Sequence, residues 1–313
     1  MTGRVSRRGL VRAAGGTALV AGLAGLGPAV ASSGTRRSAG DLVVAGGELG
    51  GSFTRFARLL GGELRDSGPV GHVRVVASGG SLDNLALLRS GSADLAPSLA
   101  DAVAVDADAA VAVARLYQTT LHCLVRDGSP FRSAGDLAGR RVAVGPLGSG
   151  SAETARRLLE PTLGVDLRAA SHATGAVALA GGSVDALLWW GGQPSPELAS
   201  LVRTHPLRAL DLGALVDATR GPAAPYQSVR LPRDVWDQAD DVRTAGVAVH
   251  LLCRPALDDA TVAHVVDTLL AAGPQLVPQP SGGLQYLAPA SLFDTYPVPL
   301  HPAAARRYRE RHG

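Results

Sequence analysis

Three clusters of glycine and serine in this chain each follow a short apolar run. They are Gly50-Gly51-Ser52 after residues 42–45, Gly79-Gly80-Ser81 after residues 73–76, and Gly148-Ser149-Gly150-Ser151 after residues 142–144. Each cluster opens a segment with helical spacing of apolar residues, which predicts a strand, a loop and a helix start. A helix start presents unpaired backbone N–H groups and the positive end of the helix dipole, and these bind an anion without any basic side chain. The clusters therefore predict a site for a small acidic molecule.

The same clusters have a plainer interpretation. Glycine and serine are common turn and helix-capping residues in any α/β protein. A serine can cap a helix and still offer its hydroxyl group to a ligand carboxylate. Because the three clusters share one layout, we favour binding over capping alone.

Several enzyme motifs are absent from the sequence. The chain contains no lysine, so all 30 of its basic residues are arginine. This excludes a phosphate-binding P-loop and a lysine Schiff base with pyridoxal phosphate. There is no G-x-S-x-G nucleophile elbow either, since Leu147 precedes the Gly148-Ser149 pair and Leu82 follows Ser81. We therefore predict no catalytic residues and no cofactor.

The N-terminus has the features of an export signal. Ser6-Arg7-Arg8-Gly9-Leu10-Val11 precedes a Gly/Ala-rich, weakly apolar stretch, and Ala29-Val30-Ala31 offers the small residues that a signal peptidase reads. The twin arginine predicts a Tat-type signal peptide over residues 1–31 and an extracytoplasmic protein, periplasmic or at the cell surface. A retained membrane anchor is the alternative, although five glycines between positions 15 and 27 make a poor spanning helix.

Removal of residues 1–31 changes the charge of the protein. That segment holds four arginines and no acid, so its loss lowers the formal net charge from +3 to −1. Apart from the short tail over 306–311, no basic cluster remains in the mature sequence, and we do not expect nucleic acid as a partner. Residues 32–40 are predicted to form a disordered mature N-terminus.

Strand-like and helix-like patterns alternate from Asp41 onward, which predicts a mostly parallel sheet with helices on both faces. Two long apolar segments, 121–126 and 247–254, bracket the middle of the chain. They predict a discontinuous first lobe, residues 41–125 plus 245–313, and a second lobe, residues 126–244. Ligands in open α/β sheets bind beyond the carboxyl ends of the strands, where the three clusters would lie. We therefore expect two lobes with a hinge and a central ligand cleft.

A series of short runs occurs in a specific order along the mature chain. The runs are residues 46–53 (GGELGGSF), 78–85 (SGGSLDNL), 91–96 (GSADLA), 136–151 (DLAGRRVAVGPLGSGS), 182–186 (GSVDA), 191–194 (GGQP) and 299–304 (PLHPAA). In this order they resemble the TAXI-type extracytoplasmic solute-binding proteins of TRAP transporters. The resemblance implies a type II periplasmic-binding-protein fold and a non-enzymatic, monomeric receptor. It also implies a small carboxylate as ligand, glutamate, glutamine or a dicarboxylate, delivered to membrane transporter subunits.

The clusters and the resemblance together give a set of expected ligand-binding residues. Phe53 and Tyr117 are expected to wall the pocket, with a core role as the alternative. Asp101 and Asp185 could meet a ligand amine, or be plain turn residues. The full set is Gly51, Ser52, Phe53, Ser81, Asn84, Asp101, Tyr117, Gly148, Ser149, Gly150, Ser151, Gly192 and Gln193.

Two other functions stay open from the sequence. The liganded protein could signal to a membrane sensor kinase instead of serving a transporter. A transferase on the same fold is a further alternative, but no nucleophile–base pair supports it.

The two cysteines and two of the histidines fall in the long apolar segments. His122 and His250 have no third ligand at metal spacing, so we predict that they pack within strands and bind no metal. The family resemblance implies that the strands of Cys123 and Cys253 lie close together, and export exposes the two thiols to oxidising conditions. We favour two separate buried thiols over a disulfide, because alignment of the two histidines leaves the cysteines out of register.

Overall fold

The computed structural model describes residues 40–68, 70–103, 108, 110–191, 196–219, 225–277 and 287–312. The described residues all belong to one compact unit, Ser38–Gly313. The expected signal peptide, nearly all of the expected disordered N-terminus, Gly192 and Gln193 lie outside the described residues. Among the helices of the described ranges, none has the length and apolar character needed to cross a membrane.

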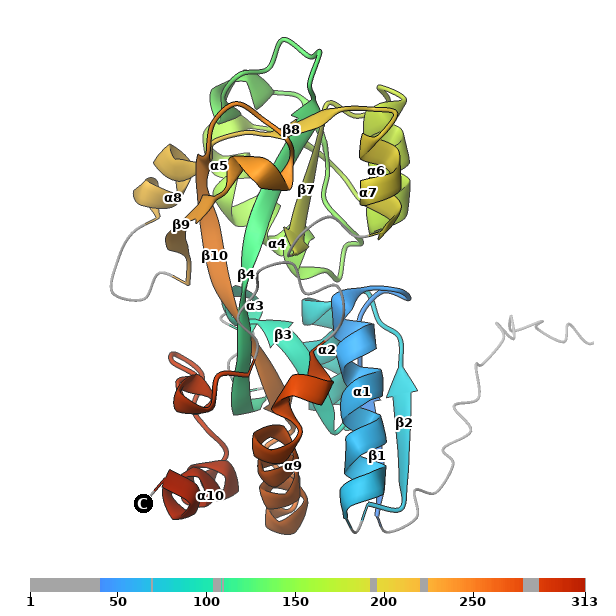
Figure 1. The fold of residues 1–313 in the computed structure, drawn as a ribbon, viewed down its shortest axis with the longest axis vertical. Helices are drawn as coiled ribbons and strands as arrows, with labels where there is room; N and C mark the ends of the chain where they lie inside the picture. Colours follow the sequence, from blue (N-terminus) through green and yellow to red (C-terminus); the bar gives the residue numbers. More distant parts are fainter. Residues whose placement is uncertain are drawn as a thin grey trace, which may run out of the picture. The chain divides into compact units, whose positions relative to one another are not determined.

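The strands of the described residues join in one ten-stranded sheet (Figure 1). Its order is β2-β1-β3-β10-β4-β7-β5-β6, with β8 beside β4 and β9 beside β10. The strands are β1 (Asp41–Ala45), β2 (His72–Val76), β3 (Leu95–Leu99), β4 (Val111–Arg126), β5 (Arg141–Ala143), β6 (Asp166–Arg168), β7 (Ala186–Gly191), β8 (Leu207–Ala209), β9 (Gln227–Leu231) and β10 (Val242–Cys253).

Helices begin where the Gly/Ser clusters predict them, because α1, α2 and α4 start at Ser52, Ser81 and Gly150. Each of them follows a strand, β1, β2 or β5, so the predicted strand–loop–helix layout is confirmed for all three clusters. The α-helices are α1 (Ser52–Ser67), α2 (Ser81–Arg89), α3 (Ala100–Val103), α4 (Gly150–Leu158), α5 (Glu160–Leu163), α6 (His172–Ala180), α7 (Pro196–Val202), α8 (Gly213–Ala218), α9 (Asp259–Ala271) and α10 (Pro302–His312). Short 3₁₀ helices are η1 (Ala134–Leu137), η2 (Arg233–Val235), η3 (Gly273–Leu276) and η4 (Pro289–Ser291).

The sheet is less parallel than the sequence predicts. The pairs of β1 with β2 and β3, and of β5 with β6 and β7, are parallel. Every pair that involves β4 or β10 is antiparallel. The expectation of a mostly parallel sheet is therefore wrong. These two long strands run past each other in opposite directions through the middle of the sheet, and so they cannot both follow the βαβ pattern.

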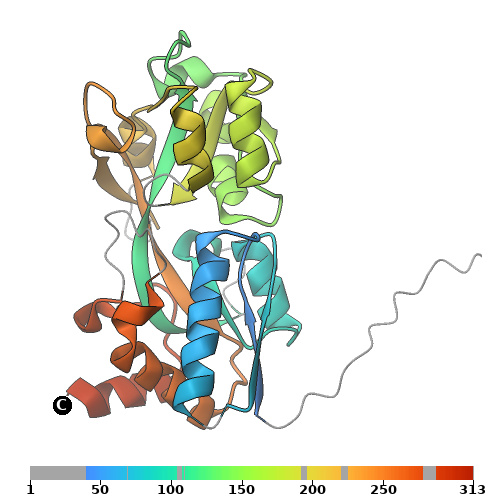
Figure 2. The ribbon, with the colours of Figure 1, turned by 45° about the vertical axis from the view of Figure 1, so that its right-hand side comes forward.

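The long strands β4 and β10 link two groups of elements (Figure 1). One group holds β1 to β3 with α1, α2, α9 and α10, and the other holds β5 to β8 with α4 to α7; Figure 2 separates them more clearly. We propose that these groups are the two lobes, residues 41–125 with 245–313 and residues 126–244. The hinge would then lie in β4 and β10, and register shifts interrupt their pairing at Val249/His250 and Leu251/Leu252.

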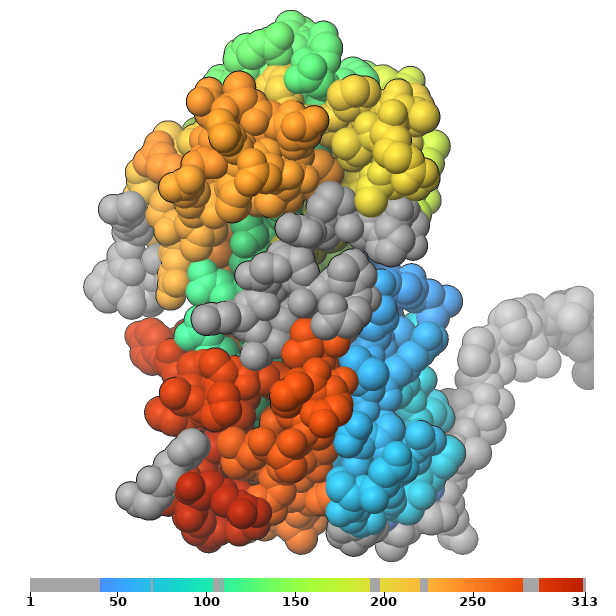
Figure 3. Space-filling view, viewed as in Figure 1, coloured from blue at the N-terminus to red at the C-terminus, as the bar shows by residue number. Residues whose placement is uncertain are grey.

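The core is built of alanine, valine and leucine, as the aromatic-poor composition requires. In α1, Phe56, Leu60 and Leu64 recur every four residues and are all buried, which fixes this helix on β1 and β2. Helix α9 packs beside α1, so the last part of the chain lies against the first part (Figure 3). A smaller apolar cluster joins Leu124 of β4 to residues of the proposed second lobe, among them Leu179, Leu187 and Trp236.

Candidate functional site

Two of the three Gly/Ser loops meet each other directly. The carbonyl oxygen of Gly148 accepts hydrogen bonds from the backbone N–H groups of Leu82 at 3.0 Å and Asp83 at 3.3 Å. Both donors belong to the first turn of α2, where a helix leaves its N–H groups without an internal partner. A loop of one proposed lobe therefore caps a helix of the other.

The loops approach closely at Gly148 and Gly80, where a larger residue would displace the Asp83 side chain or strain the backbone. A Cβ atom on Gly148 would lie 2.0 Å from Oδ1 of Asp83. Gly80 has a φ of +126°, and a Cβ there would lie 3.2 Å from Cα of Ser149. The predicted residues Ser81, Gly148, Ser149 and Gly150 are thus brought together, since a Cβ on Gly150 would lie 2.9 Å from the hydroxyl oxygen of Ser81.

The serines of these loops make internal hydrogen bonds. Ser149 is the N-cap of α4, and its Oγ accepts a hydrogen bond from the N–H of Ala152 at 3.1 Å. Ser81 does not cap its helix; its Oγ accepts a hydrogen bond from the N–H of Leu99 at 3.1 Å. The capping interpretation therefore holds for Ser149, and Ser81 joins α2 to the end of β3. Ser151 is half-buried in the first turn of α4.

The third cluster lies at the start of α1. Gly51 is the N-cap and makes no side-chain cap bond, and Ser52 and Phe53 are half-buried. Phe53 packs against the main core, which is the alternative role that the sequence left open. Thr54, which the sequence analysis did not select, organises this loop, because its Oγ1 accepts a hydrogen bond from the N–H of Gly47 at 3.0 Å.

Asn84 ties three loops together. It is fully buried, and its Nδ2 donates to the carbonyl oxygens of Gly46 at 2.6 Å and Pro97 at 2.8 Å. Its Oδ1 accepts a hydrogen bond from Oγ of Ser78 at 2.7 Å. These bonds fix the segments that follow β1 and β2 and the strand β3 relative to one another, and the amide nitrogen has no hydrogen left to offer a ligand.

Asp101 is buried between the two proposed lobes. Its Oδ2 lies 2.9 Å from Oγ1 of Thr154 in α4 and 2.8 Å from the hydroxyl oxygen of Tyr226. Burial raises the pKa of this carboxyl group, and the hydrogen bond from the Tyr226 hydroxyl opposes the shift. Trp190 stacks on Tyr226 with ring centroids 6.3 Å apart. Asp101 therefore belongs to the contact between the lobes and is not a plain turn residue.

A second carboxyl group joins the proposed lobes at Glu48. Its Oε2 accepts a hydrogen bond from the N–H of His172, the first residue of α6, at 3.2 Å. Burial raises the pKa of Glu48, while the bond from His172 lowers it. The His172 ring stacks on Trp189 at 4.7 Å. Nothing in the local sequence identifies Glu48, because its partner lies 124 residues away.

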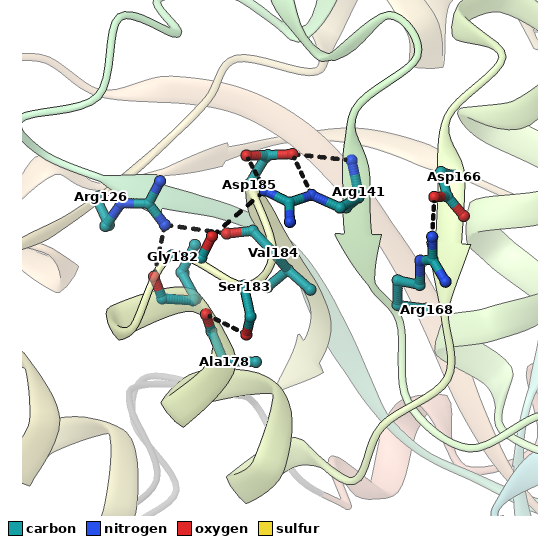
Figure 4. Close-up of polar contacts among 10 residues, drawn as sticks. Arg126, Arg141, Asp166, Arg168, Ala178, Gly182, Ser183, Val184 and Asp185 are labelled. Atoms are coloured by element: carbon teal, nitrogen blue, oxygen red, sulfur yellow. Dashed lines mark hydrogen bonds and ion pairs between the residues drawn. The ribbon is translucent and has the colours of Figure 1, made fainter.

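Tyr117 and Asp185 have roles other than joining the two proposed lobes. Tyr117 is buried in β4 opposite Val249, where it packs with the main core. The Asp185 carboxylate accepts hydrogen bonds from the guanidinium of Arg141 at 3.1 Å on each oxygen (Figure 4). Burial alone would raise the pKa of Asp185, but the Arg141 bonds lower it overall. Asp185 thus forms an ion pair beside β5, and the backbone N–H of Arg141 also donates to it.

The histidines do not form a metal centre in the described part of the chain, where no group of three His, Cys, Asp or Glu side chains could hold an ion. His122 is buried, and its Nδ1 accepts a hydrogen bond from Nε1 of Trp236 at 2.9 Å. His250 is buried in β10, and burial lowers its pKa to about 4. Both side chains pack within strands, as predicted.

Many solved structures are similar to this chain, and three are given as examples. XAC2383 from Xanthomonas citri, bound to ATP, is 15% identical, with a TM-score of 0.53 over 87% of this chain and 95% of its own. The periplasmic aliphatic sulphonate binding protein SsuA from Escherichia coli is 18% identical, with a TM-score of 0.43 over 87% of this chain and 79% of its own. The P235GK mutant of ArgBP from T. maritima is 15% identical, with a TM-score of 0.46 over 75% of this chain and 90% of its own.

The predicted α/β fold of the periplasmic-binding-protein type is confirmed. A family model matches residues 56–311, which is most of the chain. On this match, the protein belongs to the NMT1-like family.

Proposed function

We propose that this protein is an exported solute-binding receptor that captures a small carboxylate and delivers it to a TRAP-type membrane transporter. The observation that carries the proposal is the arrangement of the Leu82 and Asp83 N–H groups, which both point at one oxygen atom, the carbonyl oxygen of Gly148. A carboxylate oxygen accepts stronger hydrogen bonds than a carbonyl oxygen does. A ligand carboxylate that replaced Gly148 would therefore find two donors already aimed at it.

The charge beside these donors refines the proposed ligand. The Asp83 carboxylate accepts a hydrogen bond from the N–H of Gly79 at 2.8 Å and lies next to Gly148. A purely anionic ligand would be repelled by this group, whereas an ammonium group would be attracted. Glutamate and glutamine, which carry both a carboxylate and an ammonium group, therefore suit the junction better than plain dicarboxylates.

The route of export and the client belong to the same proposal. The twin-arginine segment supports Tat export to an extracytoplasmic location. The ordered runs that resemble TAXI-type proteins support a TRAP transporter as client, and membership of the NMT1-like family is compatible with this subdivision. In this role the protein is a binding protein and not an enzyme.

Native mass spectrometry of the purified protein tests the proposal first, because a co-purified solute would be seen directly. Isothermal calorimetry then compares glutamate, glutamine, 2-oxoglutarate and succinate, together with ATP, the ligand of the XAC2383 structure. We expect one of the carboxylates to bind. If ATP alone binds, the protein is a nucleotide receptor and the carboxylate proposal is wrong.

Serine variants separate ligand binding from helix capping. Ser81→Ala and Ser149→Ala should each weaken binding of the confirmed carboxylate by about 1–2 kcal/mol, the worth of one hydrogen bond to a charged group. Ser133→Ala is the matched control, since Ser133 caps the distant helix η1. Equal affinities for all three variants would limit Ser149 to helix capping and Ser81 to its hydrogen bond with Leu99.

A further inference from the structure

The carboxyl group of Asp101 lies where α3 of one proposed lobe meets α4 and Tyr226 of the other. Its side chain is fully buried, and Oδ2 contacts Thr154 Oγ1 at 2.9 Å and the Tyr226 hydroxyl at 2.8 Å. The backbone N–H of Ala102 also interacts with the carboxyl group and opposes the rise of its pKa. Oδ1 is also buried and has no hydrogen-bond partner. An ionised carboxylate seeks donors on both oxygens, so this arrangement is poorly suited to a negative charge.

The hydroxyl group of Thr154 decides where the hydrogen atoms are. Its Oγ1 lies 2.8 Å from Nε1 of Trp190, 2.9 Å from the carbonyl oxygen of Gly150 and 2.9 Å from Oδ2 of Asp101. The indole can only donate, and the Gly150 carbonyl can only accept. A threonine in a helix commonly donates to the carbonyl four residues earlier, which here is Gly150.

The single hydrogen of Thr154 is then used on Gly150. The 2.9 Å contact with Oδ2 is a hydrogen bond only when Asp101 supplies the hydrogen. A protonated Asp101 satisfies every position of the Thr154 hydroxyl, with two bonds accepted and one donated. The Tyr226 hydroxyl donates to Oδ2 in addition, and burial raises the pKa of Tyr226 so that it keeps its proton.

The charges around Asp101 permit a neutral acid. Among the described residues, the charged group that acts on this carboxyl is the guanidinium of Arg157 in α4. That guanidinium is already paired with Glu153 at 2.6 Å, and its NH1 donates to the backbone oxygen of Asp101 at 2.8 Å. The positive charge of Arg157 is therefore matched by another carboxylate.

We propose that Asp101 joins the two proposed lobes as a neutral carboxylic acid, so that closure of the lobes takes up one proton from solvent. In the open form the carboxyl group would meet water and lose that proton. The inference concerns the closure itself and does not depend on which solute is bound.

The direction of the pH effect follows from burial. Burial raises the pKa of Asp101 in the closed form above its ordinary value, so the closed form binds the proton more tightly than the open form. The contribution of Asp101 to closure is therefore complete below the ordinary aspartate pKa and is lost as pH rises through the raised pKa.

Infrared difference spectroscopy tests the protonation state of the purified protein without any ligand. The spectrum of the wild type minus Asp101→Asn at neutral pH should contain the C=O stretch of a protonated carboxyl group. The spectrum of the wild type minus Asp166→Asn, an exposed acid paired with Arg168, should contain only carboxylate bands. A carboxylate signal from Asp101 would overturn the proposal.

Small-angle scattering tests the coupling to closure. The radius of gyration of the wild type should increase as the pH is raised, whereas Asp101→Asn should stay compact, because its amide is neutral and still donates to Thr154. Thr154→Val removes the group that accepts the Asp101 proton, so this variant should open at a lower pH than the wild type does. It remains informative if Asp101→Asn fails to fold. Wild-type scattering that is independent of pH, or identical pH profiles for the wild type and the variants that fold, would overturn the proposal.

Discussion

The carboxylate of Glu48 accepts a hydrogen bond from the backbone N–H of His172, although 124 positions separate the two residues. Glu48 follows β1 and His172 begins α6, so a side chain of one proposed lobe caps a helix of the other. Together with the Gly148 contact to α2 and the Asp101 contact to α4, this bond makes the junction between the lobes polar. Each of these contacts joins a helix start or helix side to an oxygen atom.

Substitution of Glu48 should separate its hydrogen bond from its charge. Glu48→Ala removes the acceptor and should lower the free energy of unfolding by about 1 kcal/mol, the usual worth of a helix cap. Glu48→Gln keeps an acceptor oxygen. The folded state favours the protonated acid, since burial raises the pKa of Glu48 from its ordinary 4.5.

The stability of the wild type relative to Glu48→Gln should therefore fall as the pH rises through that raised pKa. Urea unfolding between pH 4 and pH 8 measures the difference. A wild type that gains stability over Glu48→Gln with rising pH would contradict the assigned direction.

Gly148→Ala should disrupt the contact between the loop and α2. The added Cβ would lie 2.0 Å from Oδ1 of Asp83, so the exposed Asp83 side chain must rotate away and give up its hydrogen bond from the N–H of Gly79. We expect a loss of about 1–3 kcal/mol in unfolding free energy, as for other overpacked sites. Gly128→Ala is the control, because a Cβ at Gly128 meets nothing within 4 Å. Thermal unfolding of Gly148→Ala and Gly128→Ala measures the two losses. Equal losses would show that the contact at Gly148 does not stabilise the protein.

The Asp185–Arg141 ion pair should stabilise the protein at neutral pH. The hydrogen bonds from Arg141 hold the pKa of Asp185 below its ordinary value despite burial, so the stabilisation is present above that ordinary value and is lost as the pH falls through the lowered pKa. Asp185→Asn should cost no more than about 1 kcal/mol at pH 7, because the Arg141 side chain is 44% exposed and solvent screens the pair. It should cost less at acidic pH. Asp166→Asn, in a more exposed pair, should cost close to nothing, and chemical denaturation at both pH values compares them.

The two cysteines should behave as inert thiols. Both are buried and free, and burial raises the pKa of Cys123 and of Cys253 to about 12. Iodoacetamide at pH 8 should modify neither thiol in the native protein. After denaturation without reductant, the intact mass should increase by two alkyl groups. A mass with none would demonstrate a disulfide.

The cysteines also show what a sequence pattern leaves open. The sequence places them correctly in the two long strands, Cys123 in β4 and Cys253 in β10. The expectation that the two strands lie close together is confirmed, since β4 pairs with β10. The strands run in opposite directions, however, so Cys253 faces Val111, at the far end of β4 from Cys123. Apolar runs indicate a strand but not the direction of its neighbour.

In the candidate site, too, the sequence predicts the local features but not the tertiary contacts. The Gly/Ser clusters predict the helix starts at Ser52, Ser81 and Gly150, because capping chemistry is local. The contacts of Glu48 with His172 and of Asp101 with Tyr226 depend on the tertiary fold. No spacing rule connects residues that are more than a hundred positions apart.

The place of β10 between β3 and β4 has a consequence for synthesis of the chain. Residues 126–244 are contiguous and can fold as soon as they are made, but the sheet of the other proposed lobe has a gap until residues 242–253 arrive. Until then β3 and β4 present unpaired edges, which are sites for wrong pairing and aggregation. Completion of this lobe therefore waits until residues 242–253 have been translated, and chaperones that cover exposed strand edges would be needed most before that point.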